Sequence, residues 1–248
     1  MKMENKKILI GCPTANFKEY CLDEYIKGLK NLSYPNFDLI VVDNSKTNDY
    51  FETLKKKINK EAIPNAKNIE IIKDEFKERA RDRIVSSRNI IRQKVLDGKY
   101  DCFLSLEQDI VAHKDIIERL LDGLEKIKEQ SNKEIKIITA VYFNNQVIGL
   151  KQILAPLVYV EHFMDKTGMM FIPKHRLLEG KIIPIKACGI GCILIHRDVL
   201  EKVKFRYEGK GFDDMMFCKD SIEKGFDIWC DCSLIVEHFP GDWTNIEK

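Results

Sequence analysis

Short apolar runs alternate with longer amphipathic stretches along the first 142 residues. The apolar runs cover residues 8–11, 38–43, 69–72, 102–106 and 135–141. Their length and their content of β-branched residues predict buried strands. The intervening stretches have the length and charge of helices and cover residues 19–30, 50–60, 75–96 and 115–129. This alternation predicts an α/β fold with a mostly parallel central sheet and helices on both faces.

The second half of the chain has a weaker pattern. Residues 143–181 contain short apolar pieces and five glycines or prolines but no clean helical period. Long irregular segments in compact domains are usually lids or binding loops, so we expect a mobile loop here. The tail regains strand patterns at 182–187, 192–196, 226–230 and 234–236, and helix patterns at 198–203 and 214–224. We therefore predict one domain over 1–248, divided into a regular half, 1–142, and an irregular half, 143–248.

Composition narrows the class of protein. The 248 residues are 44% hydrophobic and 32% charged, which is typical of a globular protein of one or two domains. A net charge of +2 gives no basic field for nucleic acid. No apolar run approaches the roughly 18 residues of a membrane span, and the first seven residues are polar. We expect a cytoplasmic protein with at most peripheral contact with the inner membrane face, and its eight cysteines are predicted to be reduced, buried thiols.

Acidic residues follow two of the predicted strands. Glu107 and Asp109 flank Gln108 directly after the run 102–106, and Asp43 ends the run 38–43. The carboxyl ends of parallel strands meet at one edge of a sheet, so these side chains can share a crevice. Hard divalent ions prefer oxygen ligands, and such a pair could hold Mg²⁺ or Mn²⁺. Solvated acids at strand ends, or a turn at Asp43, would give the same pattern.

Three further features can carry chemistry. Arg81, Arg88 and Arg92 lie at positions i, i+7 and i+11, which places them on one face of the helix 75–96. A second acidic pair, Asp213 and Asp214, opens the helix 214–224, where capping and the helix dipole alone would favour carboxylates. A histidine, His238, follows the last apolar run and is either structural or a metal ligand.

The order of these signals resembles the GT-A glycosyltransferases, most closely the family 2 group of inverting enzymes. The matching stretches are residues 41–45, 87–89, 103–109, 189–195, 211–218 and 236–238. They span nearly the whole chain in the order of that family. The resemblance implies a Rossmann-like α/β/α sandwich in which residues 1–142 bind a nucleotide-sugar, UDP- or GDP-linked, and the irregular part 143–248 binds an acceptor. The acceptor would be a glycan, a lipid-linked molecule or a protein.

The resemblance also implies roles on the donor side. Asp43 would accept a hydrogen bond from the nucleobase, and Arg88 would pair with the diphosphate or with a strand-end carboxylate. Asp109 and His238 would bind Mn²⁺ or Mg²⁺, and Glu107 would reach the ribose hydroxyls or a metal-bound water. Glu107 departs from the Asp-x-Asp signature of the family, in which the first residue is also Asp.

On the acceptor side, the resemblance makes Asp214 the general base, with Asp213 in place of the Glu of the family. Gly189 and Gly191 would lie under the donor sugar and the acceptor, where small residues allow close approach. Pro13, in a turn predicted after the first strand, is assigned to the donor site.

Three alternatives stay open. A sugar-phosphate nucleotidyltransferase would need a glycine-rich, basic loop after the first strand, and residues 11–16 have one glycine and no arginine. A non-catalytic relative would keep the fold and bind the nucleotide-sugar without turnover. A retaining enzyme would share the sheet but place its acceptor groups differently.

Overall fold

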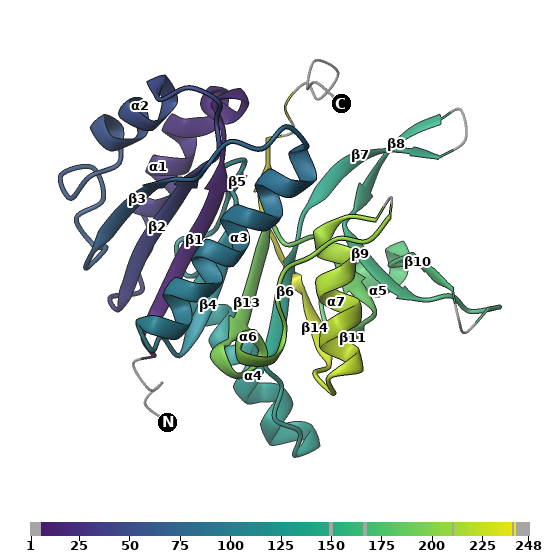
Figure 1. Ribbon diagram of the computed structural model, residues 1–248. Coiled ribbons are helices and arrows are strands. Elements are labelled where there is room, and N and C mark those ends of the chain that lie inside the picture. Colours follow the sequence, from purple (N-terminus) through teal and green to yellow (C-terminus); the bar gives the residue numbers. More distant parts are fainter. Residues whose placement is uncertain (1–5, 149–150, 166–167, 210, 240, 242–248) are drawn as a thin grey trace.

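The computed structural model describes residues 6–148, 151–165, 168–209, 211–239 and 241. Its centre is an eight-stranded sheet with the order β11-β14-β6-β13-β4-β1-β2-β3 (Figure 1). These strands are β1 (Ile8–Thr14), β2 (Phe37–Asp43), β3 (Ile69–Lys73), β4 (Cys102–Leu106), β6 (Ile137–Val141), β11 (Ile182–Ile185), β13 (Cys192–His196) and β14 (Ile228–Ile235). The neighbours β4, β1, β2 and β3 run parallel, whereas β13 runs antiparallel to β4 and β6.

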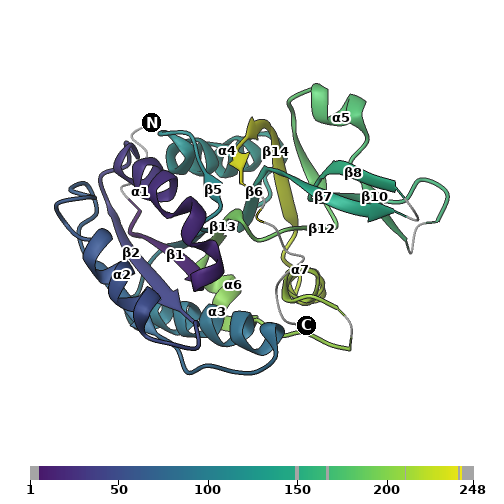
Figure 2. The ribbon, with the colours of Figure 1, turned by 90° about the horizontal axis from the view of Figure 1, so that it is seen from above.

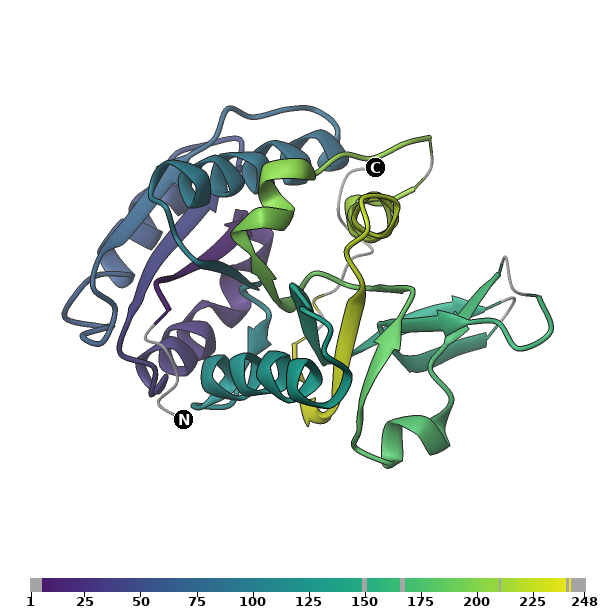
Figure 3. The same cartoon turned by 90° about the horizontal axis from the view of Figure 1, so that it is seen from below.

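Helices cover both faces of this sheet. One face packs against α1 (Leu22–Lys30), α2 (Asp49–Lys57) and α4 (Ile116–Ser131). The other packs against α3 (Ala80–Asp97), α6 (Arg197–Lys202) and α7 (Asp213–Glu223). The view from below in Figure 3 shows the sheet between these layers. The predicted α/β fold with a mostly parallel central sheet is confirmed.

The apolar strands divide their side chains between two cores. In β1, Ile8 and Ile10 join the core under α1 and α4, while Leu9 between them joins the core under α3. In β4, Leu104 and Phe103 divide in the same way. A strand covered on both faces needs apolar residues at every position, which explains why these runs are continuous in the sequence.

Element boundaries differ from the sequence prediction in several places. The first strand continues through Pro13 and Thr14, where a turn was expected. β1 pairs with β4 only as far as Gly11, so beyond that point Pro13 borders a single strand and its missing N–H is tolerated. The helix α3 begins at Ala80, five residues later than predicted. The two short strands predicted at 226–236 form the single strand β14, which pairs with β6 through a register shift.

Residues 143–181 hold strands where an irregular loop was predicted. A hairpin of β7 (Phe143–Ile148) and β8 (Lys151–Pro156) projects to one side of the sheet, as the view from above shows (Figure 2). Next to it lie β9 (Val158–Glu161), β10 (Met169–Phe171) and β12 (Ala187–Cys188), which form a small sheet, and the short helix α5 (Lys174–Leu178). The pattern hid this hairpin because Val147 and Leu154 are exposed and polar residues lie between them, so no buried face sets a period.

Two short elements complete the part of the fold that carries the site. A 3₁₀ helix, η1 (Asn16–Cys21), follows β1 directly. The strand β5 (Ile110–Val111) pairs with β15 (Glu237–His238) near the end of the chain. Across the described ranges, no helix is both long enough and apolar enough to span a membrane.

Candidate functional site

Glu107 and Asp109, which we call the strand pair, lie at the carboxyl end of β4. The backbone N–H of Glu107 donates to the carbonyl of Gly191 at 2.9 Å, which ties this end of β4 to the start of β13. The side chain of Asp109 is 3% exposed and that of Glu107 is 19% exposed. The strand pair therefore lies at the rim of the sheet, as predicted, but mostly inside the protein.

His238 reaches the strand pair through the β5–β15 ribbon. The ribbon pairs His238 with Ile110, and the N–H of Phe239 donates to the carbonyl of Asp109 at 2.8 Å. His238 Nε2 lies 3.6 Å from Asp109 Oδ2. The other ring nitrogen, Nδ1, is 2.7 Å from the carbonyl oxygen of Phe143, so Nδ1 carries a proton and donates it. Burial lowers the pKa of His238, but the neighbouring Asp109 carboxylate outweighs burial and leaves this pKa raised.

A lysine that the sequence reasoning did not single out lies between the two carboxylates. Lys18 Nζ is 3.0 Å from Glu107 Oε2 and 3.0 Å from Asp109 Oδ2. Lys18 is only 6% exposed. Burial alone would raise the pKa of Asp109, yet the Lys18 ammonium and His238 hold it at about 2. Both members of the strand pair therefore have lowered pKa values and share a cation that the protein itself supplies.

This arrangement does not fit the predicted Mn²⁺ or Mg²⁺ site. A divalent ion bound by Glu107 and Asp109 would take the position between them that the Lys18 ammonium holds. Among the described residues, no group of three His, Cys, Asp or Glu side chains is arranged to hold a metal ion. Asp109 Oδ1 is buried and accepts no hydrogen bond from the described residues, so one oxygen of the strand pair is still able to accept one. A single carboxylate oxygen does not make a metal site.

The middle residue of the triplet, Gln108, connects β4 to the backbone of Lys18 and to two hydroxyl groups. Its side chain is fully buried, and its Oε1 accepts hydrogen bonds from Thr14 Oγ1 at 2.5 Å and from Tyr50 Oη at 2.8 Å. Its Nε2 donates to the backbone carbonyl of Lys18 at 2.5 Å. Pro13, assigned to the donor site from the sequence, is a buried residue of β1 next to Thr14, and its role in donor binding stays a prediction.

Arg88 connects the strand pair to the second acidic pair, Asp213 and Asp214, which we call the helix pair. Arg88 lies on α3 and is 4% exposed. Its Nη2 is 2.5 Å from Glu107 Oε1, and its Nε is 2.6 Å from Asp213 Oδ2. The sequence placed Arg88 opposite a strand-end carboxylate or a diphosphate, and in the structure a strand-end carboxylate is its partner. Its helix neighbours Arg81 and Arg92 donate elsewhere, to the carbonyls of Gly209 and Val203.

Among the described residues, Asp214 is the member of the helix pair that makes no ion pair, whereas Asp213 pairs with Arg88. It lies in the first turn of α7, where its Oδ1 accepts from the N–H of Met215 at 2.7 Å. Burial, followed by the charge of Asp213, raises the pKa of Asp214 from 3.8 to about 6. A carboxylate with a pKa near neutrality exchanges protons readily at physiological pH. Asp214 therefore has the properties of a general base.

Asp43, predicted to receive the nucleobase, ends β2 as expected and is fully buried. Its Oδ2 lies 2.8 Å from Lys73 Nζ, and its Oδ1 accepts from the backbone N–H of Ser45 at 3.0 Å. Lys73 and Ser45 thus each contact one of the two carboxylate oxygens of Asp43. The role of Asp43 in binding a base stays a prediction.

Gly189 and Gly191 have a packing reason to be glycine. A Cβ on Gly189 would lie 2.0 Å from the hydroxyl of Tyr142, and one on Gly191 would lie 2.8 Å from its ring. The same hydroxyl accepts a hydrogen bond from the N–H of Gly191 at 3.0 Å. The Tyr142 ring also meets that of His238 edge to face, with centroids 5.4 Å apart. Tyr142 therefore supports the site, and sequence reasoning missed it because it lies among ordinary core residues.

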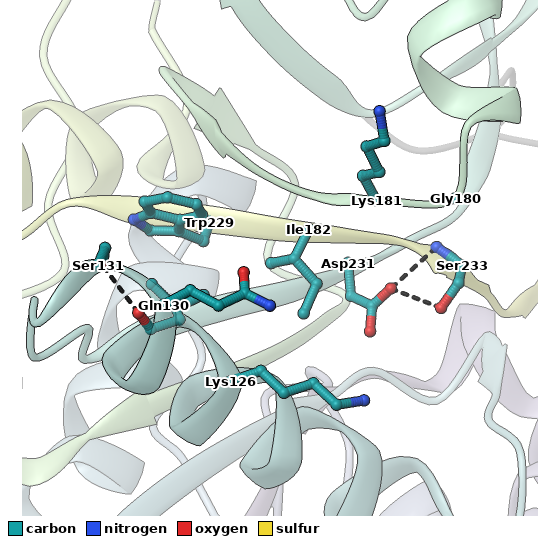
Figure 4. Close-up of a pocket in the computed structure, with 10 residues that line it drawn as sticks. Lys126, Gln130, Ser131, Gly180, Lys181, Ile182, Trp229, Asp231 and Ser233 are labelled. Atoms are coloured by element: carbon teal, nitrogen blue, oxygen red, sulfur yellow. Dashed lines mark hydrogen bonds between the residues drawn. The ribbon is translucent and has the colours of Figure 1, made fainter.

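A separate cavity of about 360 Å³ lies at the far side of β14, against α4 (Figure 4). Its lining includes Lys126, Gln130, Lys181, Trp229 and Asp231. None of the predicted site residues lines it. It is distinct from the site at the carboxyl ends of β1, β2 and β4.

No protein-family model matches the sequence, and no curated protein matches it. Solved structures do resemble the fold. A mannosyltransferase from Pyrobaculum calidifontis, in complex with GDP-Man and Mn²⁺, has a TM-score of 0.60 at 12% identity, covering 96% of this chain and 58% of that one. S. aureus TarS (residues 1–349) with UDP-GlcNAc has a TM-score of 0.57 at 12% identity, covering 98% and 61%.

GalNAc-T7, in complex with UDP, GalNAc and Mn²⁺, has a TM-score of 0.62 at 12% identity, covering 95% of this chain and 44% of that one. This chain thus spans about half of the length of these three proteins. At such low identity the likeness concerns the fold and not the chemistry of individual residues. The chain has a GT-A-like glycosyltransferase fold.

Proposed function

We propose that this protein transfers a sugar from a nucleotide-sugar donor to an acceptor hydroxyl. One observation carries the proposal: the strand pair and the helix pair meet at one edge of a GT-A-like sheet, joined by the buried Arg88. Glycosyl transfer needs one region that tolerates a diphosphate and another that accepts a proton from the nucleophile. The two acidic pairs, with their different neighbours, suit these two tasks.

On the acceptor side, Asp214 is the general base. An acceptor hydroxyl is a weak nucleophile until its proton is withdrawn during attack, and a carboxylate with a pKa of about 6 can accept that proton at neutral pH. Asp213 is held by Arg88, so it orients the first turn of α7 instead of exchanging protons. Attack by the hydroxyl on the anomeric carbon, opposite the leaving diphosphate, would invert the configuration of the sugar.

On the donor side, the nucleotide lies across the carboxyl ends of β1, β2 and β4. Two buried cations, Lys18 and Arg88, offset part of the negative charge there, which lowers the repulsion of a diphosphate. The nucleobase would lie over the end of β2, where Lys73 and Ser45 cover Asp43. The buried, unpartnered oxygen of Asp109, Oδ1, can accept a hydrogen bond from a ribose or sugar hydroxyl.

Residues 143–248 supply the acceptor side of this scheme. They include α7 with Asp214, and the projecting β7–β8 hairpin with the exposed side chains of Val147 and Leu154. An acceptor bound beside α7 would contact this hairpin or the small sheet next to it. A glycan, a lipid-linked molecule and a protein acceptor are all compatible with that placement.

A thermal-shift panel of UDP-, GDP-, dTDP- and CMP-sugars, followed by a nucleoside diphosphate release assay, tests the proposal. One nucleotide class should raise the melting temperature by several degrees and release its diphosphate on turnover. Binding without release, with a full set of acceptors, would identify a non-catalytic relative. No shift and no release with any donor would contradict the proposed function.

A further inference from the structure

We infer that Lys18 is the resident cation of the donor site and takes the place of a divalent metal ion. This inference rests on the proposed function for the identity of the ligand, a nucleoside diphosphate. The geometry that carries it does not depend on that function. Lys18 Nζ lies 3.0 Å from an oxygen of each member of the strand pair, in a position that is 6% exposed.

The location of Lys18 is determined by several independent contacts. Its backbone lies in η1, directly after β1, where its N–H donates to the carbonyl of Ala15 at 2.9 Å. Its own carbonyl accepts hydrogen bonds from Gln108 Nε2 and from Cys21 Sγ. The main chain of Lys18 is therefore fixed at the same triplet whose carboxylates receive its ammonium.

The hydrogen bonds of Gln108 orient its side-chain amide toward the backbone of Lys18. Both lone-pair directions of its Oε1 are used by hydroxyl donors, Thr14 Oγ1 and Tyr50 Oη. The amide is consequently oriented with its Nε2 toward the Lys18 carbonyl. The triplet 107–109 thus binds one residue with all three of its side chains, the outer two to the ammonium and the middle one to the backbone.

The charges are consistent with a resident monovalent cation. Glu107 and Asp109 together bring two negative charges into a mostly buried space, and Arg88 already takes one oxygen of Glu107. The Lys18 ammonium adds one positive charge between them. Buried ions are stable only when they are paired, and Lys18 together with Arg88, which Asp213 shares, gives each member of the strand pair a cation without an external ion.

The Lys18 ammonium would do in the donor complex what a bound metal ion does elsewhere. It offsets one of the two negative charges of the strand pair at the edge where the diphosphate leaves. Donor binding should then be independent of divalent metal. Removing the Lys18 amine should convert Glu107, Asp109 and His238 into a site that a metal ion can enter.

The experiment measures Mn²⁺ binding by calorimetry without any nucleotide, for wild type, Lys18→Ala, Lys18→Arg and the surface control Lys27→Ala. Wild type, Lys18→Arg and Lys27→Ala should bind Mn²⁺ weakly or not at all. Lys18→Ala should bind it at least about tenfold more tightly, because Asp109 and one oxygen of Glu107 then lose the ammonium that lies between them. Equal, tight Mn²⁺ binding by wild type and Lys18→Ala would overturn the inference.

A second measurement adds the donor identified in the thermal-shift panel, with EDTA or with Mn²⁺. The dissociation constant of wild type should agree within about twofold between the two conditions, whereas Lys18→Ala should lose binding in EDTA and recover it in Mn²⁺. A wild type that binds its donor only with Mn²⁺ would contradict the inference. If Lys18→Ala unfolds in EDTA, restoration of its melting transition by Mn²⁺ supports the inference, and unfolding in both conditions leaves the wild-type comparison to decide it.

The two proposals fail in different ways. If no nucleotide-sugar binds under any condition, the proposed function fails, and the metal titration without nucleotide still reports on Lys18. If a donor binds wild type only with Mn²⁺, the proposed function stands and the inference on Lys18 fails.

Discussion

The strand pair and the helix pair contain the same kind of group in opposite states. Both members of the strand pair have a cation within 3.0 Å, and the pKa of Asp109 is lowered to about 2. In the helix pair, within the described part of the chain, only Asp213 has one, and the pKa of Asp214 is raised to about 6. All four carboxylates are partly or fully buried, so burial alone does not explain the difference. The placement of Lys18 and Arg88 does.

This difference assigns the two pairs to different tasks. A carboxylate locked in the ionised state cannot exchange protons at neutral pH but can hold a cation and shape a charged surface. A carboxylate whose ionised form lacks compensation takes up a proton readily. The protein thus separates a binding region from a proton-accepting region by the position of two cations, and the variants below test that separation.

The largest effect is expected from Asp214→Asn. Loss of the general base should lower turnover by about 10²- to 10⁴-fold with little change in donor affinity. The variant should also be more stable at pH 7, because the ionised carboxylate is disfavoured in the fold: a rise of about 2 pKa units corresponds to at most about 3 kcal/mol. That gain should vanish below about pH 4, where Asp214 is protonated in both the folded and the unfolded chain. Unchanged turnover would remove Asp214 from the mechanism.

Arg88→Met should break the link between the pairs. It leaves buried carboxylates of Glu107 and Asp213 without their shared partner, which costs about 3–5 kcal/mol of stability. Chemical denaturation measures this change. Arg81→Met is the matched control on the same helix, since among the described residues the Arg81 guanidinium donates only to the carbonyl of Gly209 and otherwise faces aromatic rings. A similar small loss for both variants would contradict the bridging role.

Gly189→Ala tests whether Tyr142, which packs against His238, supports the strand pair. The new methyl group would meet the Tyr142 hydroxyl at 2.0 Å, so Tyr142 or the loop must shift, at about 1–3 kcal/mol. Tyr142 also packs against His238, so the shift should reach the strand pair. Denaturation and donor binding together measure both effects. If Gly189→Ala were as stable as wild type, the loop that contains residue 189 would adjust without cost, and the supporting role of Tyr142 would be contradicted.

The smallest effect is expected in the pH profile of turnover. With Asp214 as the base, the rate should fall about tenfold for each pH unit below about 6 and level off above it. The strand pair should not contribute within this range, because the pKa of Asp109 lies near 2. A profile that is flat between pH 5 and pH 7 would show that Asp214 does not limit the reaction.

The sequence predicted most of the sheet because strands buried on both faces are continuous apolar runs, as in β1, β2 and β4. It also located the acidic groups, since the carboxyl ends of parallel strands converge wherever such a sheet forms. The β7–β8 hairpin was missed because its exposed, partly polar strands have no buried face to set a period.

Lys18 was missed for a different reason. It reaches Glu107 across 89 positions in the sequence, and its direction depends on the 3₁₀ turn that η1 makes after β1. A lysine in an amphipathic stretch is usually a solvated surface residue, so no local pattern distinguishes it. Only the tertiary structure shows that it enters the carboxylate pair.

The most direct test of the proposed transfer is product analysis with the donor selected by the thermal-shift panel. Nucleoside diphosphate release and the anomeric configuration of the product would be measured for wild type and Asp214→Asn. We predict release with inversion by wild type and at least about 10²-fold slower release by Asp214→Asn. Equal release by both proteins, or no release from any donor by folded wild type, would contradict the account.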